Sequence, residues 1–257
     1  MRKTVLVTGA SSGIGKSFAE EYAKKGHDIV LVARSADQLK IVAKELEKNY
    51  AINTYIILAD LSKEYEAKKV YTIVKEKKLT IDVLINNAGF ATNGIFSDVE
   101  LQKQHEQVMV NSTAVMDMCH LFIEEMAQNK AGTIINVAST SSFHPIPYMS
   151  VYAATKAFVL SFTEALNIEY KNKGIKIIAI CPGATDTNFF ANGGVSFGNK
   201  RTPKDVVNTT LKGLKKGKVS IIDGINNLFT SIVLPKILPR KNMVGMVGNI
   251  MGKRINE

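Results

Sequence analysis

The sequence is poor in the residues that build metal sites and disulfide networks. Its 257 residues include no tryptophan, two cysteines and four histidines. Cys119 and Cys181 are far apart in the chain and lack any metal-ligand spacing. We therefore expect two reduced thiols and no catalytic metal.

Long apolar runs are also missing. The chain has no stretch of about 18 uninterrupted apolar residues, so no transmembrane helix is expected. It starts Met-Arg-Lys and continues into a short apolar run at residues 4–8. That run is too short for the core of a signal peptide and leads at once into a glycine-rich loop. We therefore expect a cytoplasmic location.

Acidic residues are outnumbered by basic ones. The chain has 33 lysines and arginines against 23 aspartates and glutamates, which gives a net charge of +10. Such an excess can attract anionic partners, including nucleic acid and membranes. The lysines are spread along the chain, however, and no arginine-rich cluster contains interleaved aromatic residues. We expect a solvated basic surface and no nucleic-acid partner.

Two patterns alternate along the chain. Continuous apolar runs predict buried strands at residues 4–8, 28–33, 52–58, 82–85, 133–138, 175–180 and 219–222. Helical apolar spacing predicts helices at residues 14–25, 36–49, 63–78, 98–128, 151–171 and 203–215. Strands that are apolar on both faces are typical of a parallel sheet covered by helices on both sides. We predict a single doubly wound α/β domain with a seven-stranded sheet over residues 1–224.

A glycine-rich loop follows the first predicted strand. It reads Thr8-Gly-Ala-Ser-Ser-Gly-Ile-Gly15 and opens the first predicted helix. Glycines permit a tight turn and let backbone N–H groups approach a phosphate, and the start of a helix favours an anion. The loop therefore predicts a dinucleotide-binding site. Its expected contacts are Gly9, Ser11, Ser12, Gly13, Ile14 and Gly15.

A tyrosine and a lysine stand four residues apart in the predicted helix at residues 151–171. Tyr152 and Lys156 therefore lie on one face of that helix. A free phenol has a pKa of about 10, and a nearby cation lowers this pKa because it stabilises the phenolate. Ser139, after a predicted strand, can donate a hydrogen bond to a substrate oxygen. Beside a dinucleotide, these groups favour proton and hydride transfer to a carbonyl.

Further motifs follow the glycine loop in a fixed order. They are Asp60-Leu61, Asn86-Asn87-Ala88-Gly89, Asn111, Ser139, Tyr152, Lys156 and Pro182-Gly183. With the loop spacing Gly-x-x-x-Gly-x-Gly, this set resembles the short-chain dehydrogenase/reductase family over residues 3–223. The resemblance implies a Rossmann-type domain that binds a nicotinamide dinucleotide.

The resemblance also implies roles for single residues. Tyr152 is the expected acid/base, Lys156 its tuner and a ribose ligand, and Ser139 the group that orients the substrate. Asn111 is expected in a water-linked proton relay. The remaining implied cofactor contacts are Asp60 and Leu61 beside the adenine, Asn87, Ala88 and Gly89 beside the ribose, Pro182, Gly183, and Thr187 near the carboxamide.

The end of the second predicted strand indicates which dinucleotide binds. An acidic residue at that place binds the ribose 2′-hydroxyl of NAD. This chain has Ala33 instead, followed by Arg34 and Ser35. Arginine suits a 2′-phosphate through paired, charged hydrogen bonds, and Ser35 can add a hydroxyl contact. We therefore predict NADP as the cofactor.

Apolar residues near the motifs indicate the kind of substrate. Residues 184–200 carry Phe189, Phe190 and Phe197 and form either an apolar lid or an ordinary loop. A second group that we expect to line the same pocket comprises Phe143, His144, Ile146, Pro147 and Met149. The expected substrate is a small apolar ketone or aldehyde, or the corresponding alcohol.

Residues 225–257 form a C-terminal extension that the family motifs do not explain. An apolar run at residues 228–234 is interrupted by Pro235 and Pro239. Apolar residues then recur at helical spacing over residues 243–251, among basic ones. Three roles remain open for this helical extension. We favour packing on the same domain or on a partner subunit. The other two roles are a cover over the substrate mouth and a contact with a membrane surface.

The main hypothesis is an NADP-dependent oxidoreductase that acts on an apolar ketone, an aldehyde or a secondary alcohol, with tyrosine as acid/base. One alternative is a 3-oxoacyl-thioester reductase, since positive charge suits an acidic carrier protein. Another is a non-catalytic protein that senses the dinucleotide, against which the complete set of Ser139, Tyr152 and Lys156 argues. By resemblance we expect a homodimer or homotetramer. The motifs do not encode the substrate, the direction or the stereochemistry.

Overall fold

The chain folds around one parallel β-sheet. The computed structural model describes residues 2–187, 189 and 200–256. Its strands are β1 (Thr4–Thr8), β2 (Asp28–Ala33), β3 (Thr54–Leu58), β4 (Val83–Asn86), β5 (Gly132–Val137), β6 (Ile175–Cys181) and β7 (Ser220–Ile222). All pairs are parallel, in the order β3-β2-β1-β4-β5-β6-β7. The predicted single doubly wound α/β domain with a seven-stranded sheet is confirmed.

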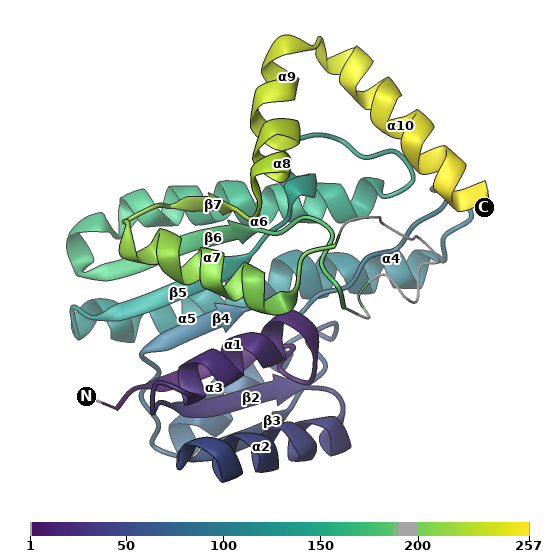
Figure 1. Ribbon diagram of the computed structural model, residues 1–257. Helices are drawn as coiled ribbons and strands as arrows, with labels where there is room; N and C mark the ends of the chain where they lie inside the picture. Colours follow the sequence, from purple (N-terminus) through teal and green to yellow (C-terminus); the bar gives the residue numbers. More distant parts are fainter. Residues whose placement is uncertain (1, 188, 190–199, 257) are drawn as a thin grey trace.

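Helices cover both faces of this sheet (Figure 1). One face carries α1 (Gly13–Ala23), α2 (Ala36–Tyr50) and α7 (Pro203–Lys215). The other carries α3 (Glu66–Glu76), α4 (Leu101–Val108), α5 (Ala114–Gln128) and α6 (Ser150–Glu169). Because side chains alternate along a strand, Val5 and Val7 face the first layer while Leu6 faces the second. Two apolar cores result, one on each face of the sheet.

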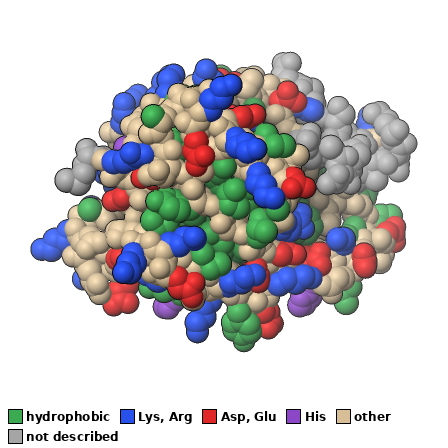
Figure 2. Space-filling view, turned by 90° about the horizontal axis from the view of Figure 1, so that it is seen from below, with side chains coloured by type: hydrophobic (Ala, Val, Ile, Leu, Met, Phe, Trp, Pro, Cys, Tyr) green, Lys and Arg blue, Asp and Glu red, His purple; other side chains and the backbone are tan. Residues whose placement is uncertain are grey.

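Basic and acidic side chains are mixed on the surface of the body. Figure 2 shows lysines and arginines interspersed with acidic residues around an apolar patch on the face seen from below. Ion pairs such as Arg2–Asp28 and Lys16–Glu45, each at 2.6 Å, join charges of opposite sign. At exposed positions such a pair contributes at most about 1 kcal/mol. These charges therefore keep the surface solvated more than they stabilise the fold.

The long helical segment predicted at residues 98–128 is confirmed for residues 101–128, but it is not a uniform α-helix. It consists of α4 and α5 joined without a break by a π-helical turn, Met109–Thr113. A π turn inserts an extra residue into a helix, which apolar spacing alone does not reveal. Asn111 lies in this turn, fully buried, and its side chain bonds to the backbone of Phe90 after β4. These amide bonds hold the π turn against that loop.

The C-terminal extension is helical, as predicted. It consists of α8 (Ile225–Leu228), a π-helical turn (Phe229–Val233), α9 (Leu234–Ile237) and α10 (Arg240–Asn256). Leu238 has extended backbone angles because it precedes Pro239, and this ends α9 and turns the chain. Figure 1 shows α8 and α9 standing away from the sheet and α10 returning towards the body. None of the described helices combines the length and apolar character needed to cross a bilayer.

Strand order reverses between β1 and β4, and a buried hydroxyl joins the two strands there. Thr8, the last residue of β1, is 2% exposed. Its Oγ1 accepts hydrogen bonds from the backbone N–H groups of Asn87 (2.9 Å) and Ala88 (3.0 Å). The same hydroxyl donates to the carbonyl of Ile85 at 3.4 Å. This contact fixes the loop after β4 against the glycine loop after β1.

We predict that Thr8→Val lowers the free energy of unfolding by about 2 kcal/mol or more. Valine keeps the shape but leaves the N–H groups of Asn87 and Ala88 without their acceptor. Urea unfolding followed by circular dichroism measures the loss. Thr4→Val, at the other end of β1, is the matched control and should change stability little. Equal stability of the Thr8→Val and Thr4→Val proteins would contradict the prediction.

Candidate active site

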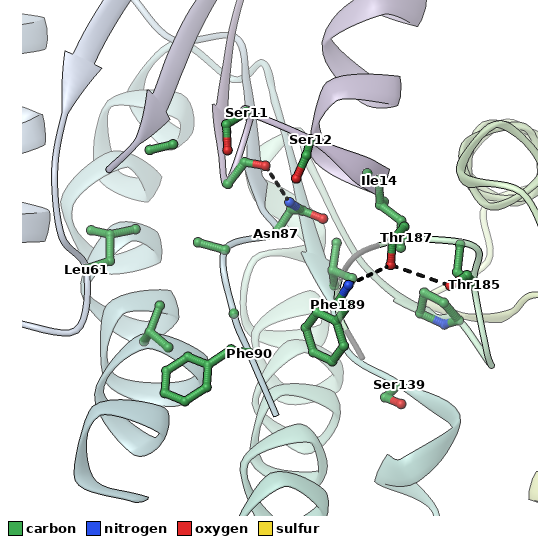
Figure 3. Close-up of a pocket in the computed structure, with 18 of the residues that line it drawn as sticks. Ser11, Ser12, Ile14, Leu61, Asn87, Phe90, Ser139, Thr185, Thr187 and Phe189 are labelled. Carbon is green, nitrogen blue, oxygen red and sulfur yellow. Dashed lines mark hydrogen bonds between the residues drawn. The ribbon is translucent and has the colours of Figure 1, made fainter. Parts of the chain in front are cut away.

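A cavity of about 460 Å³ opens at the carboxyl ends of the strands. It lies where the strand order reverses, which is where open α/β sheets bind ligands. Its volume is in the range of small-molecule and cofactor sites. Figure 3 shows Ser11 and Ser12 of the glycine loop at one side, Ser139 at the opposite side, and Phe189 between them.

Most of the residues predicted from the sequence line this cavity. They are Gly9, Ser11, Ser12, Gly13, Ile14, Arg34, Ser35, Asp60, Leu61, Asn87, Ala88, Gly89, Ser139, Tyr152, Lys156, Pro182, Gly183 and Thr187. Gly15 and Asn111 do not line it but lie behind its wall. Sequence reasoning missed Phe90, Val137 and Thr185, which also line it. Each stands next to a motif, but no pattern in the chain marks it as a contact.

Close backbone contacts shape the glycine loop. Gly9 has a φ of 64°, and a Cβ on it would meet Asn87 Nδ2 at 2.8 Å. A Cβ on Gly15 would meet the carbonyl oxygen of Gly9 at 2.2 Å. Gly15 therefore allows α1 to approach the loop closely. The Asn87 amide donates to the carbonyls of Thr8 (3.0 Å) and Gly9 (3.3 Å), so it holds this cradle in place.

At the end of the cavity beside β2 and β3, the solvent-exposed rim is polar and the buried floor is apolar. Arg34 and Ser35 are exposed and line it. The Asp60 carboxylate accepts hydrogen bonds from the N–H (3.2 Å) and the hydroxyl (2.8 Å) of Ser62. Leu61 is buried and packs into the core under the cavity. This end offers a cation and a hydroxyl to an anion, and an apolar floor to a flat ring.

Tyr152, Lys156 and Ser139 meet at the other end. Tyr152 and Lys156 lie one turn apart near the start of α6, and both are buried. The Ser139 hydroxyl hydrogen-bonds to the Tyr152 phenol, and its oxygen accepts from the N–H of Ser141 at 3.1 Å. The Lys156 ammonium donates to the carbonyl of Val137 at 2.7 Å. The end of β5 and the start of α6 therefore hold the three side chains as one group.

Burial dominates the proton chemistry of this group. It raises the pKa of the Tyr152 phenol to about 12, while the hydrogen bond from Ser139 acts in the opposite direction. It also lowers the pKa of Lys156 to about 8, against a smaller opposing effect of Cys181. The expected lowering of the Tyr152 pKa is therefore wrong for this structure, because the cost of a charge away from water raises this pKa. Positive charge brought into the cavity would work against the burial effect on Tyr152.

Asn111 connects the π turn to two neighbouring elements. Its Oδ1 accepts from the N–H of Phe90 at 3.1 Å, and its Nδ2 donates to the carbonyl of Phe90 at 2.9 Å. Nδ2 also donates to the Thr155 hydroxyl in α6 at 3.1 Å. The side chain therefore positions the loop after β4 against the helix that carries Tyr152. Its part in a proton relay stays a prediction.

An apolar cluster closes the substrate end of the cavity. Met149, Tyr152 and Met251 form its buried centre, and the surrounding residues are Ala91, Ile146, Tyr148, Phe189 and Val247. The rings of Tyr152 and Phe189 have centroids 5.8 Å apart. Met251 belongs to α10, so the C-terminal extension packs on its own chain beside the phenol. Of the roles left open for the extension, packing against the same chain is seen at Met251, whereas no residue of the extension lines the cavity and covering of its mouth stays a prediction.

Two expectations about the substrate side need correction or qualification. Phe143 does not belong to the cluster around Tyr152 but lines a separate cavity beside β7 with Ile221 and Leu228. The 3₁₀ turn Thr140–Ser142 reverses the chain after Ser139 and directs Phe143 away from the catalytic end. Of the three phenylalanines expected in a lid, Phe189 is placed as described above, whereas Phe190 and Phe197 lie outside the described residues.

The loop after β6 brings Thr187 to the glycine loop. A Cβ on Gly13 would lie 3.0 Å from Thr187 Cγ2. The Thr187 hydroxyl oxygen accepts from the N–H of Phe189 at 3.3 Å, and the hydroxyl donates to the carbonyl of Thr185 at 3.5 Å (Figure 3). Thr187 therefore stands between the start of α1 and the apolar cluster. Its predicted contact with a carboxamide stays a prediction.

The cavity suits a nicotinamide dinucleotide. Its glycine cradle leaves room for a phosphate at the start of α1, its β2–β3 end has a polar rim over an apolar floor, and its other end holds a buried phenol and ammonium. A Rossmann-type sheet with such a site is typical of nicotinamide-dependent oxidoreductases. The family model for short chain dehydrogenase matches residues 3–194. The chain belongs to the short-chain dehydrogenase family, so the resemblance is confirmed.

Named relatives and solved structures agree with this assignment. The chain is 37% identical over 183 residues to the very-long-chain 3-oxoacyl-CoA reductase of Bos taurus. The match covers 69% of this chain and 57% of that protein, so the chain spans less than two thirds of the relative's length. A short-chain dehydrogenase from Sphingobium yanoikuyae in complex with NADPH has a TM-score of 0.84 and 31% identity, with 95% of each chain covered. The bulky-bulky ketone specific alcohol dehydrogenase from Comamonas testosteroni has a TM-score of 0.81 and 32% identity, covering 95% of this chain and 94% of its own.

We predict that Lys156→Met removes a pH dependence of stability between pH 8 and the ordinary lysine pKa of about 10.5. In that window the unfolded chain binds a proton that the folded chain does not, so wild-type stability rises with pH. The difference in unfolding free energy between the two proteins should change by about 3 kcal/mol across the window. Urea titrations at pH 7 and pH 10.5 measure it, with the exposed Lys44→Met as control. Parallel pH profiles of the wild type and Lys156→Met would contradict the prediction.

Proposed function

We propose that this protein is an NADP-dependent reductase of bulky apolar ketones or aldehydes, or in the reverse direction a dehydrogenase of the corresponding alcohols. The observation that carries the proposal is the apolar cluster around Tyr152. Met149, Phe189 and Met251 surround the phenol with carbon and sulfur. Apolar substituents on the carbonyl would be buried there, whereas a sugar or an acid would lose its hydration. The similar dehydrogenase from Comamonas testosteroni, named for bulky ketones, supports this substrate class.

The residues of the chain supply the proton and the orientation. A nicotinamide dinucleotide supplies or accepts the hydride when bound. Tyr152 donates its proton to the carbonyl oxygen during reduction and takes it back during oxidation. The Ser139 oxygen accepts from Ser141, and its hydroxyl, which contacts the Tyr152 phenol in this structure, would turn its hydrogen to the substrate oxygen. Lys156 uses one ammonium hydrogen on Val137 and keeps the others for ribose hydroxyls or water.

The preference for NADP rests on Arg34 and Ser35. Both line the end of the cavity beside β2, and Ala33 stands where an acid would repel a 2′-phosphate. A guanidinium binds a phosphate through paired hydrogen bonds. The NADPH complex of the similar dehydrogenase from Sphingobium yanoikuyae supports this choice.

A 3-oxoacyl-thioester reductase is the second candidate. The apolar cluster around Tyr152 suits an acyl chain as well as a bulky ketone. The similarity to a protein named very-long-chain 3-oxoacyl-CoA reductase favours this candidate specifically. A protein that only senses the dinucleotide is less well supported, because Ser139, Tyr152 and Lys156 meet in one group.

We also propose a homodimer or homotetramer. Support comes from the outer surface of α5 and α6, where Met116 and Phe158 are 41% and 42% exposed. The Phe158 ring stacks on Phe162 with centroids 5.6 Å apart, which forms a flat apolar surface suited to a second subunit. The cytoplasmic location remains a prediction.

We predict that Tyr152→Phe lowers kcat by about 100-fold or more, because phenylalanine cannot transfer the proton. NADPH binding, followed by cofactor fluorescence, should stay close to that of the wild type. Tyr148→Phe, four residues earlier in the turn before α6, is the control and should keep most of the turnover. Full turnover by Tyr152→Phe would refute the proposed chemistry.

The substrate is tested with a panel followed through NADPH absorbance. It contains a ketone with two bulky apolar groups, acetone, a ketose and a 3-oxoacyl-CoA. We expect the highest kcat/KM for the bulky ketone. A higher kcat/KM for the acyl-CoA would favour the second candidate, and a preference for the ketose would contradict both.

We predict that Arg34→Ala reduces the preference for NADPH over NADH by about 10- to 100-fold, the value of a lost charge-assisted hydrogen bond. The ratio of kcat/KM for the two cofactors measures this preference. Lys40→Ala, an exposed cation on α2 outside the cavity, is the control. An unchanged ratio in Arg34→Ala would show that the 2′-phosphate is not read at this position.

A further inference from the structure

The C-terminal extension carries an apolar surface that the proposed function does not use. Ile225, Phe229, Val233 and Ile237 recur at every fourth residue through α8, the π turn and α9. These side chains are 77%, 52%, 38% and 68% exposed, and Leu228 beside them is 41% exposed. We refer to these five residues as the apolar stripe. A run of large apolar side chains at this exposure on one element is uncommon on a soluble surface and marks an interaction site.

The π turn keeps the stripe on one side. In an α-helix, residues four apart overshoot a full turn, so such a row winds slowly around the axis. A π turn holds more residues than an α turn and winds the row back. Phe229–Val233 is π-helical. The backward rotation in this turn compensates for the forward rotation in α8 and α9, so Ile225 and Ile237 stay in line with the residues between them.

The base of the extension is anchored, so the stripe is held out from the body. Asp223, fully buried at the end of β7, accepts from Arg201 Nε at 2.5 Å and from the Thr209 hydroxyl at 2.6 Å. The Asn227 amide of α8 donates to the carbonyl of the same aspartate at 2.6 Å. Figure 1 shows that α8 and α9 project from this base away from the sheet. At the far end, α10 returns to the body, with Met243 and Met251 buried.

Basic side chains dominate the charge of the extension, whose one acidic side chain is the last residue, Glu257. Residues 224–256 contain no aspartate or glutamate, and their basic residues are Lys236, Arg240, Lys241, Lys253 and Arg254. Lys236, Arg240 and Lys241 are exposed at the end of the stripe, next to Ile237. This differs from the body, where both signs are interspersed on the face seen in Figure 2.

We propose that the apolar stripe docks this protein peripherally on an anionic lipid bilayer. Apolar side chains beside lysine and arginine match a surface that has acyl chains below and negative headgroups above. A second copy that met the stripe through its own stripe would offer no acidic side chain of residues 224–256 to pair with Lys236 and Arg240. The stripe contains no residue of the catalytic group.

The test is flotation of the purified full chain with two kinds of vesicle. One contains equimolar phosphatidylcholine and phosphatidylserine, and the other contains phosphatidylcholine alone. We expect the protein to float with the first kind and much less with the second. Equal flotation with both, or no flotation with either, would overturn the proposal.

Two independent variants locate the contact. Lys236→Gln with Arg240→Gln should weaken binding by about 30-fold, from about 1 kcal/mol for each basic residue at the surface. Phe229→Ser with Ile237→Ser should weaken it by at least tenfold, about the value of one buried apolar side chain. Both variants should keep the wild-type circular dichroism spectrum and cofactor binding. Unchanged vesicle affinity in both would overturn the proposal.

Matched controls carry the same changes elsewhere. Ile41→Ser removes an isoleucine that is 49% exposed on α2. Lys171→Gln with Lys173→Gln removes two exposed charges before the start of β6, at the opposite end of the strands from α8. Both controls should bind vesicles like the wild type. Light scattering tests whether a second copy of the chain occupies the stripe. If the Phe229→Ser, Ile237→Ser protein has a smaller molar mass than the wild type but binds vesicles equally well, the stripe is a contact between two copies and the proposal is overturned.

Discussion

The hydroxyl of Thr8 is the contact on which the site depends. It sits where the strand order reverses and binds two backbone N–H groups of the neighbouring loop. Asn87 completes the connection by donating from its side chain to the carbonyls of Thr8 and Gly9. The glycine loop and the loop after β4 are therefore one hydrogen-bonded unit. The cradle for a phosphate and the wall beside the ribose keep a fixed distance because neither loop can move without breaking these bonds.

The catalytic end is organised by exclusion of water. Tyr152 and Lys156 are both buried, and burial moves their pKa values in opposite directions, upward for the phenol and downward for the ammonium. Each shift reflects the same cost of charge in a medium of low dielectric constant. The Tyr152 phenol therefore keeps its proton until a positive charge arrives nearby. The apolar cluster with Met251 packs against this phenol.

Much of this architecture follows from sequence patterns. Apolar runs predicted all seven strands, and the motif order brought eighteen of the twenty predicted residues to the cavity wall. Local spacing could not reveal the π turn at Met109–Thr113, because the apolar pattern continues through it. It could not place Met251 beside Tyr152 either, since that contact depends on how α10 returns to the body. The direction of Phe143 depends on a 3₁₀ turn that has no distinct sequence signal. Sequence patterns therefore did not predict contacts between distant segments or small changes of helical winding.

A short parallel bridge joins Thr185 to Arg201. The N–H of Asp186 donates to the carbonyl of Arg201 at 2.8 Å, and the N–H of Arg201 donates to the carbonyl of Ala184 at 3.0 Å. Loop-closure entropy grows only slowly with length, so insertions or deletions between these two residues should cost the sheet little. Since Arg201 also binds Asp223 at the base of the extension, the loop after β6 and the extension share one anchor, and a change at Arg201 would disturb both segments together.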